Sequence, residues 1–83
     1  MPSHQINIVV VVNGQEAPIS ASPEAPLHSI LEKALHETGN IGQGPDNWEF
    51  RDADGNPLDL GTKLGALGAG ARIFLNLKAG IGG

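Results

Sequence analysis

The sequence predicts a two-layer α+β domain in which a single helix packs across a mixed sheet of four or five strands. Three features predict this class: a β-branched hairpin at the start, one amphipathic helix after it, and an alternating strand near the end. A strand–strand–helix–strand–strand order buries the apolar side of the helix against one face of the sheet. The other face of the sheet is then left to solvent.

The first expected element is a β-hairpin. Residues 5–12 are almost wholly β-branched, which is typical of a strand packed on at least one face. Asn13-Gly14 follows, the strongest two-residue signal for a type I′ turn. Residues 15–21 are the expected return strand, and Pro18 places that strand at the sheet edge because proline has no N–H to donate.

One helix should follow this hairpin. Residues 22–26 contain a serine, an acid and two prolines, which suit the first turn of a helix, and Ser22 is the expected cap. Gly39 suits the left-handed position after the last turn. Glu24 and Glu32 lie four residues on either side of His28 and should form modest surface pairs with it. The apolar stripe of the helix consists of Leu27, Ile30, Leu31, Ala34 and Leu35.

The second half of the chain completes the sheet. Residues 48–52 alternate apolar and charged, as in a half-buried strand, and Trp48 and Phe50 should be core. Asp54-Gly55 predicts a second turn before a short strand at residues 57–59. Residues 61–70 form an irregular connection with room for one helical turn, and residues 72–78 form the last strand. We therefore expect one domain, residues 1–78, followed by a flexible tail, residues 79–83.

Size and composition favour a binding or carrier module over an enzyme. A chain of 83 residues has room for one core and little room for a deep active site. Its net charge is −4 and its five fixed cations are scattered, which argues against nucleic acid as a partner. The longest apolar run near the start, residues 8–12, is far too short for a membrane span, and no signal peptide precedes it. With no cysteine in the chain, these features suit the cytoplasm.

No residue pattern predicts a metal or a cofactor. His28 and His36 are eight residues apart, and neither they nor His4 have the partners of a coordination set, so solvent-exposed histidines are the better interpretation. Residues 52–56 have acidic residues in a glycine turn but lack the spacing of a calcium loop. That segment is better explained as a plain turn.

The open face of the sheet could bind a partner. If the even-numbered residues 6–12 face the helix, then Val9 and Val11 face solvent, and Phe74 of the last strand should lie beside them. Three apolar side chains on an open sheet face form a candidate docking patch for enzymes or for self-association. Isolated apolar surface residues are the equally weighted alternative.

Taken together, these elements resemble ubiquitin and its relatives, a β-grasp family. The resemblance runs from about residue 5 to Gly83 and rests on the Asn13-Gly14 hairpin, the helix stripe, the last strand and the terminal Gly82-Gly83. Residues 12–14, 38–40, 48–52 and 78–83 are similar, more narrowly, to bacterial ubiquitin-like modifiers of ubiquitination-like operons. That resemblance implies three partners: a cognate activating enzyme, a conjugating enzyme and a JAB-type deconjugating protease. The target protein is not implied.

The tail would carry the chemistry of such a modifier. The resemblance makes Gly83 the conjugation site, with Ala79, Gly80, Ile81 and Gly82 read by the activating enzyme. Glycine suits this role because, without a Cβ, it can pass through a narrow channel and leave its carbonyl open to attack. The tail lacks the arginines of eukaryotic ubiquitin, which implies a dedicated activating enzyme.

Two other functions remain open at this point. A sulfur carrier of cofactor biosynthesis would use the same fold and the same adenylated carboxylate, and would then form a C-terminal thiocarboxylate. A β-grasp interaction domain would use no tail chemistry at all.

Overall fold

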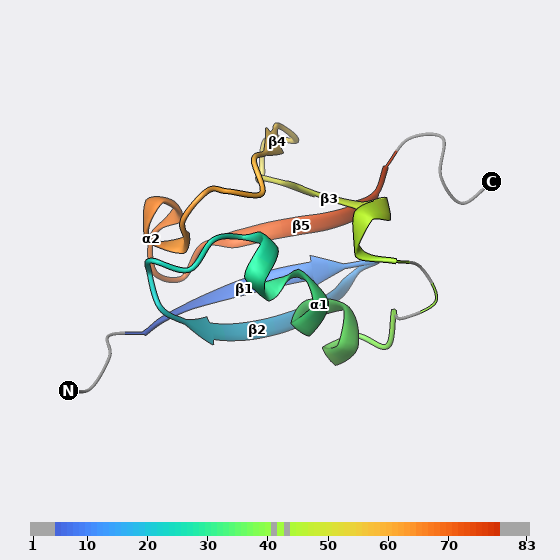
Figure 1. The fold of residues 1–83 in the computed structure, drawn as a ribbon, viewed down its shortest axis with the longest axis horizontal. Coiled ribbons are helices and arrows are strands. Elements are labelled where there is room, and N and C mark those ends of the chain that lie inside the picture. The colour runs from blue at the N-terminus through green and yellow to red at the C-terminus, as the bar shows by residue number, and fades with distance from the viewer. Residues whose placement is uncertain (1–4, 41, 43, 79–83) are drawn as a thin grey trace.

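A computed structural model describes residues 5–40, 42 and 44–78. Within these residues the chain forms a five-stranded mixed sheet with one helix packed across a face of it, which confirms the predicted α+β class (Figure 1). The strand order is β2-β1-β5-β3-β4. The predicted tail, residues 79–83, lies outside the described residues, as does His4.

The opening hairpin is confirmed. Strand β1 (Ile6–Val12) pairs antiparallel with β2 (Gln15–Ala21) around the Asn13-Gly14 turn. Both turn residues have positive φ, 51° for Asn13 and 83° for Gly14, as a type I′ turn requires. Strand β2 lies at the sheet edge, as Pro18 predicted.

The last strand completes the centre of the sheet. Strand β5 (Arg72–Leu77) runs parallel to β1 on one side and antiparallel to β3 (Trp48–Arg51) on the other. A two-residue strand, β4 (Pro57–Leu58), pairs with the end of β3. A 3₁₀ turn, η1 (Pro45–Asn47), precedes β3, and a one-turn helix, α2 (Leu64–Leu67), lies in the connection that leads to β5.

Helix α1 (His28–Glu37) covers the inner face of the sheet. It starts at His28, well after Ser22, so the predicted cap is wrong: Ser22 Oγ accepts a hydrogen bond from Glu24 N at 3.2 Å within a preceding turn. Residues 23–27 instead bond to the α2 segment, for example Gly65 N to Pro23 O at 2.8 Å and Leu64 N to Ala25 O at 2.9 Å. Tertiary backbone pairing has therefore displaced a helix start that local sequence preference favoured.

The core lies between α1 and the inner face of the sheet. Trp48 and Phe50 are buried as predicted, and the helix stripe is buried from Leu27 to Leu35. Leu64 is fully buried and Leu67 packs partly against the core, as expected for the connection before β5. The remaining core side chains come from alternate positions of the strands and are Ile8, Val10, Val12, Ala17, Ile19, Ile73 and Leu75.

Candidate functional site

The tail begins where β5 ends, and β5 is the central strand of the sheet. Leu77 is the last residue of this strand, paired with Trp48 of β3. The next residue is held too, because Lys78 N donates to Asn47 O at 2.8 Å. The backbone is therefore fixed up to Lys78, directly before the five residues that the sequence assigned to tail recognition and conjugation.

A hollow beside Leu77, at the end of β5, is lined by uncharged residues. It has a volume of about 270 Å³, and its lining residues are Asn13, Gly39, Asn40, Gly42, Trp48 and Leu77. Asn13 Nδ2 donates to Asn40 Oδ1 at 2.9 Å, which ties the β1–β2 turn to the end of the helix. Trp48 Nε1 is buried and has no hydrogen-bond partner among the described residues. Sequence reasoning missed this hollow because Asn13 and Asn40 had been considered only as turn formers.

The predicted outward patch is assembled by the strand pairing. Val11 of β1 is opposite Phe74 of β5, and Val9 is opposite Arg72 in the same parallel register. All three patch residues, Val9, Val11 and Phe74, are half-buried although no helix covers this face. The structure therefore brings the three residues together, but the patch is less open than a bare sheet face.

Charged side chains account for that partial burial. Arg72 and Glu16 form an ion pair of 2.6 Å from the two strands that flank β1. Arg51, which pairs in register with Phe74, forms a second ion pair with Glu49 at 2.9 Å. Arginine can lay its aliphatic stem along apolar neighbours while its charged head stays in water, which suits both arginines to the edge of an apolar patch. The apolar centre is thus framed by two arginines and two glutamates.

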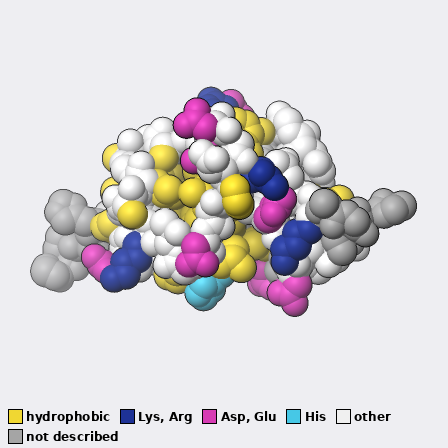
Figure 2. Space-filling model, turned by 90° about the horizontal axis from the view of Figure 1, so that it is seen from above, with side chains coloured by type: hydrophobic (Ala, Val, Ile, Leu, Met, Phe, Trp, Pro, Cys, Tyr) yellow, Lys and Arg dark blue, Asp and Glu magenta, His cyan; other side chains and the backbone are white. Residues whose placement is uncertain are grey.

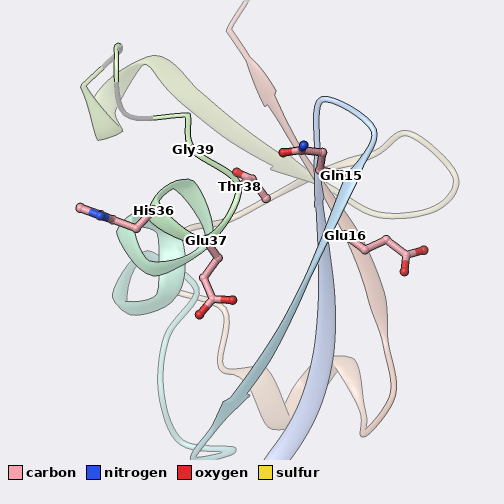
Figure 3. Close-up of a pocket in the computed structure, with 6 residues that line it drawn as sticks. All are labelled: Gln15, Glu16, His36, Glu37, Thr38 and Gly39. Atoms are coloured by element: carbon pink, nitrogen blue, oxygen red, sulfur yellow. The ribbon is translucent and has the colours of Figure 1, made fainter.

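A larger hollow lies between the hairpin and the end of α1. It has a volume of about 630 Å³ and is lined by Gln15, Glu16, His36, Glu37, Thr38 and Gly39. Figure 3 shows that the side chains of His36 and Glu16 point away from each other on opposite sides of this hollow. Its titratable groups therefore do not converge on a common point, as a general acid and base would need to.

The titratable residues weighed in the sequence lie mostly in water. His28 and His36 are exposed on α1, and among the described residues no group of three potential ligands could hold a metal ion. Neither expected pair of His28 forms: Glu24 lies before the helix and its carboxylate contacts Lys63 Nζ at 3.0 Å, and Glu32 forms no ion pair with a described residue. The described part of the chain also contains no helix that is long and apolar enough to cross a membrane.

The Asp52 turn is structural. The Asp52 carboxylate accepts hydrogen bonds from Asn56 N at 3.0 Å and from Asp54 N at 2.9 Å. The bond from the Asn56 backbone is the main cause that lowers the pKa of this carboxyl below 3.8. The side chain closes the loop between β3 and β4, which accounts for the acidic glycine turn without a calcium ion.

These features define a ubiquitin-like β-grasp fold. A ubiquitin from Caldiarchaeum subterraneum superposes with a TM-score of 0.72 at 20% identity, covering 96% of this chain and all of that one. A designed protein based on ubiquitin gives 0.73 at 18% identity, covering 95% of each chain. The ubiquitin-like domain of EccD5 from Mycobacterium xenopi gives 0.63 at 15% identity, covering 90% of this chain and 96% of that one. At these identities the likeness establishes the fold alone.

The sequence also places the chain in a family. Residues 1–83 match the model described as protein of unknown function (DUF2604), so the chain belongs to that family. A relative, uncharacterized protein y4jI of Sinorhizobium fredii (strain NBRC 101917 / NGR234), is 46% identical over 81 residues, which cover 95% of this chain. The chain spans 62% of the length of that relative.

Proposed function

We propose that this protein is a ubiquitin-like modifier, joined to its targets through the carboxylate of Gly83. The observation that carries the proposal is a ubiquitin-like fold whose central strand leads, in sequence, into the Gly82-Gly83 pair. The central strand β5 ends at Leu77, and the hydrogen-bonded Lys78 directly precedes Ala79-Gly80-Ile81-Gly82-Gly83 in the sequence. Five residues, at about 3.3 Å each when extended, give the carboxylate a reach of roughly 16 Å from the domain.

The chemistry of this proposal takes place on partner proteins. In the activating enzyme, a Gly83 carboxylate oxygen attacks the α-phosphorus of ATP, and pyrophosphate leaves as the acyl-adenylate forms. A cysteine thiolate of the enzyme then attacks the Gly83 carbonyl and AMP leaves, which gives a thioester. A cysteine thiolate of the conjugating enzyme then takes over the acyl group and releases the first thiolate, and an amine or hydroxyl of the target finally displaces this second thiolate. The modifier supplies the acyl group, and its glycines leave the carbonyl open to attack. The enzymes supply the catalytic groups.

The proposed partners follow from the resemblance to bacterial ubiquitin-like modifiers. They are a cognate activating enzyme, a conjugating enzyme and a JAB-type protease that removes the modifier, as in bacterial ubiquitination-like pathways, with the cytoplasm as the setting. Where a gene product of this family continues past the Gly82-Gly83 pair, the same protease would expose the carboxylate by cutting after Gly83. The neutral hollow beside Leu77 and the framed patch at Phe74 are the surfaces that these enzymes would contact outside the tail.

Intact mass spectrometry tests the proposal. The protein ending at Gly83 is incubated with ATP and with the proposed cognate activating and conjugating enzymes. We expect a thiol-sensitive adduct with the activating enzyme, followed by a thiol-resistant adduct with another protein. The matched control is the chain lacking only Gly83, which keeps the folded domain and should form neither adduct.

Two other results would overturn the proposal. A product carrying sulfur in place of one carboxyl oxygen, with no protein adduct, would identify a sulfur carrier. Identical partner binding by the full chain and the chain lacking Gly83, with no adduct from either, would identify an interaction domain without tail chemistry.

A further inference from the structure

Leu60 is unusual among the described residues, because it is the one large apolar side chain that counts as exposed, at 40%. Its exposure does not come from a loose loop. Leu60 O accepts a hydrogen bond from His28 N at 3.1 Å, at the first residue of α1. On either side, Thr62 N donates to Asp59 O at 3.0 Å, and Leu27 N donates to Thr62 O at 2.9 Å. The backbone that carries Leu60 is therefore held against the start of the helix.

The Leu60 side chain forms one wall of a hollow. This hollow has a volume of about 430 Å³ and lies among the first turns of α1, the segment after β4, and η1. Its lining residues are His28, Ser29, Leu31, Glu32, Asp46 and Leu60. Leu31 is buried and Leu60 is exposed, so the hollow has apolar lining both at its surface and toward the core. Figure 2, which looks at the molecule from above the view of Figure 1, shows hydrophobic side chains gathered across the middle of the surface with charged side chains around them.

The charge at the rim of this hollow is negative and uncompensated. Glu32 and Asp46 are both exposed, and neither forms an ion pair with any residue that the structure describes. Three other glutamates, Glu16, Glu24 and Glu49, already have a lysine or arginine partner. The lining therefore combines two leucines with two carboxylates that form no ion pair among the described residues, and with the side chains of His28 and Ser29.

We propose that this hollow, the Leu60 notch, binds an arginine side chain presented by a partner protein. An arginine has an aliphatic stem that can lie on Leu31 and Leu60 and a planar head that can donate to Glu32 and Asp46. The chain carries a net charge of −4, which favours approach by a basic segment. The proposal concerns the domain rather than the tail and does not depend on whether Gly83 is activated.

Nuclear magnetic resonance on the full chain tests it. The probe is the blocked tripeptide acetyl-alanyl-arginyl-alanine amide, and its control has the uncharged isostere citrulline in place of arginine. We expect saturable shifts at His28, Leu31 and Leu60 with the arginine peptide, and a dissociation constant at least about threefold higher for citrulline, as for an exposed ion pair. Leu60→Ser should weaken binding about fivefold through lost apolar contact.

Matched charge variants separate the notch from general attraction to an acidic protein. Glu32→Gln should weaken arginine binding about threefold, and Glu37→Gln, the same change on the same helix outside the notch, should leave it unchanged. Equal binding of arginine and citrulline, equal effects of the two glutamine variants, or unchanged affinity of Leu60→Ser would each overturn the proposal. Shifts at these residues that grow with protein concentration alone would also overturn it, because a second copy would then be the occupant.

Discussion

The Arg72 guanidinium on β5 and the Glu16 carboxylate on β2 meet at 2.6 Å although a whole strand, β1, lies between their backbones. Their side chains therefore pass over the outward face of β1, where Val9 and Val11 lie. This arrangement explains why two valines on an open sheet face are only half-exposed. Phe74 lies on β5, opposite Arg51 of β3, and not on β1. It is therefore the patch residue that this ion pair does not cross.

Phe74→Glu should therefore impair partner binding and leave the fold intact. The new carboxylate would lie beside Arg51, so we expect a loss of no more than about 1–2 kcal/mol in the free energy of unfolding. Binding to the activating enzyme should fall roughly tenfold, as for the loss of a central interface residue. The measurement is calorimetric titration with that enzyme. The control is Ala66→Glu, which adds the same charge at an exposed position of α2. Unchanged affinity in the Phe74 variant would remove the patch from the function.

Pro18 should protect the β2 edge from pairing with another chain. Pro18 is opposite Val9, and Val9 N donates to Ala71 O at 2.9 Å, away from β2. The pair is therefore not hydrogen-bonded across the strands, and the nitrogen of Pro18 faces the open edge. Pro18→Val would restore an outward N–H at the middle of this edge, so we expect concentration-dependent self-association, measured by analytical ultracentrifugation.

The control for that experiment is Ser20→Val, which adds an apolar side chain to the same strand and keeps the proline. We expect it to remain monomeric at concentrations where Pro18→Val associates. If both variants associate to the same extent, the added apolar side chain causes the self-association, and the restored N–H at the β2 edge does not.

Gly65→Ala should destabilise the fold through a close approach. A Cβ at residue 65 would lie 3.0 Å from Pro23 Cβ and 3.1 Å from Pro23 O, while Gly65 N is bonded to that same oxygen. We expect the free energy of unfolding, measured by chemical denaturation, to fall by about 1–3 kcal/mol, the usual cost of overpacking. Gly44→Ala, where a Cβ meets nothing within 4 Å, should stay within about 0.5 kcal/mol of the parent. A Gly65→Ala variant as stable as the parent would contradict the close approach of residue 65 to Pro23.

Asp52 should make stability depend on acid pH. Hydrogen bonds from the backbone of Asn56 and Asp54 lower the pKa of this carboxyl in the folded state below 3.8. A group with a depressed folded-state pKa stabilises the protein above its unfolded pKa, and this contribution is lost as the pH falls through the folded value. Urea denaturation should show Asp52→Asn less stable than the parent at pH 7, with the difference shrinking below pH 3.8. A difference that is constant with pH would rule out this role.

Most of the fold was predictable because its signals are local. The Asn13-Gly14 turn and the alternation at Trp48 and Phe50 each follow from a few neighbouring residues. The pairing of the first and last strands and the outward direction of Val9 were also predictable, from the pattern and from the resemblance. The helix start at His28 was not, because the backbone of residues 23–27 bonds to a segment about forty positions later in the chain.

The candidate site was predictable only in part. The patch residues were identified, but their partial burial depends on Arg72 and Glu16, which come from opposite ends of the chain. The Leu60 notch had no sequence signal at all. Leu60 follows a two-residue strand, and only the turn at Asp59 and its bond to His28 N determine that its side chain remains in water.

The parallel contact between β1 and β5 has a consequence for biosynthesis. In that register Val9 is opposite Arg72, 72 − 9 = 63 positions later in the chain. A nascent chain cannot complete this strand pair until Leu75, the partner of Val12, has left the ribosome, because such distant contacts form only after the intervening chain is available. A truncated product would therefore lack both the stable domain and the glycine pair. On the proposed function, an activating enzyme would therefore meet Gly83 only on a chain long enough to form the complete sheet.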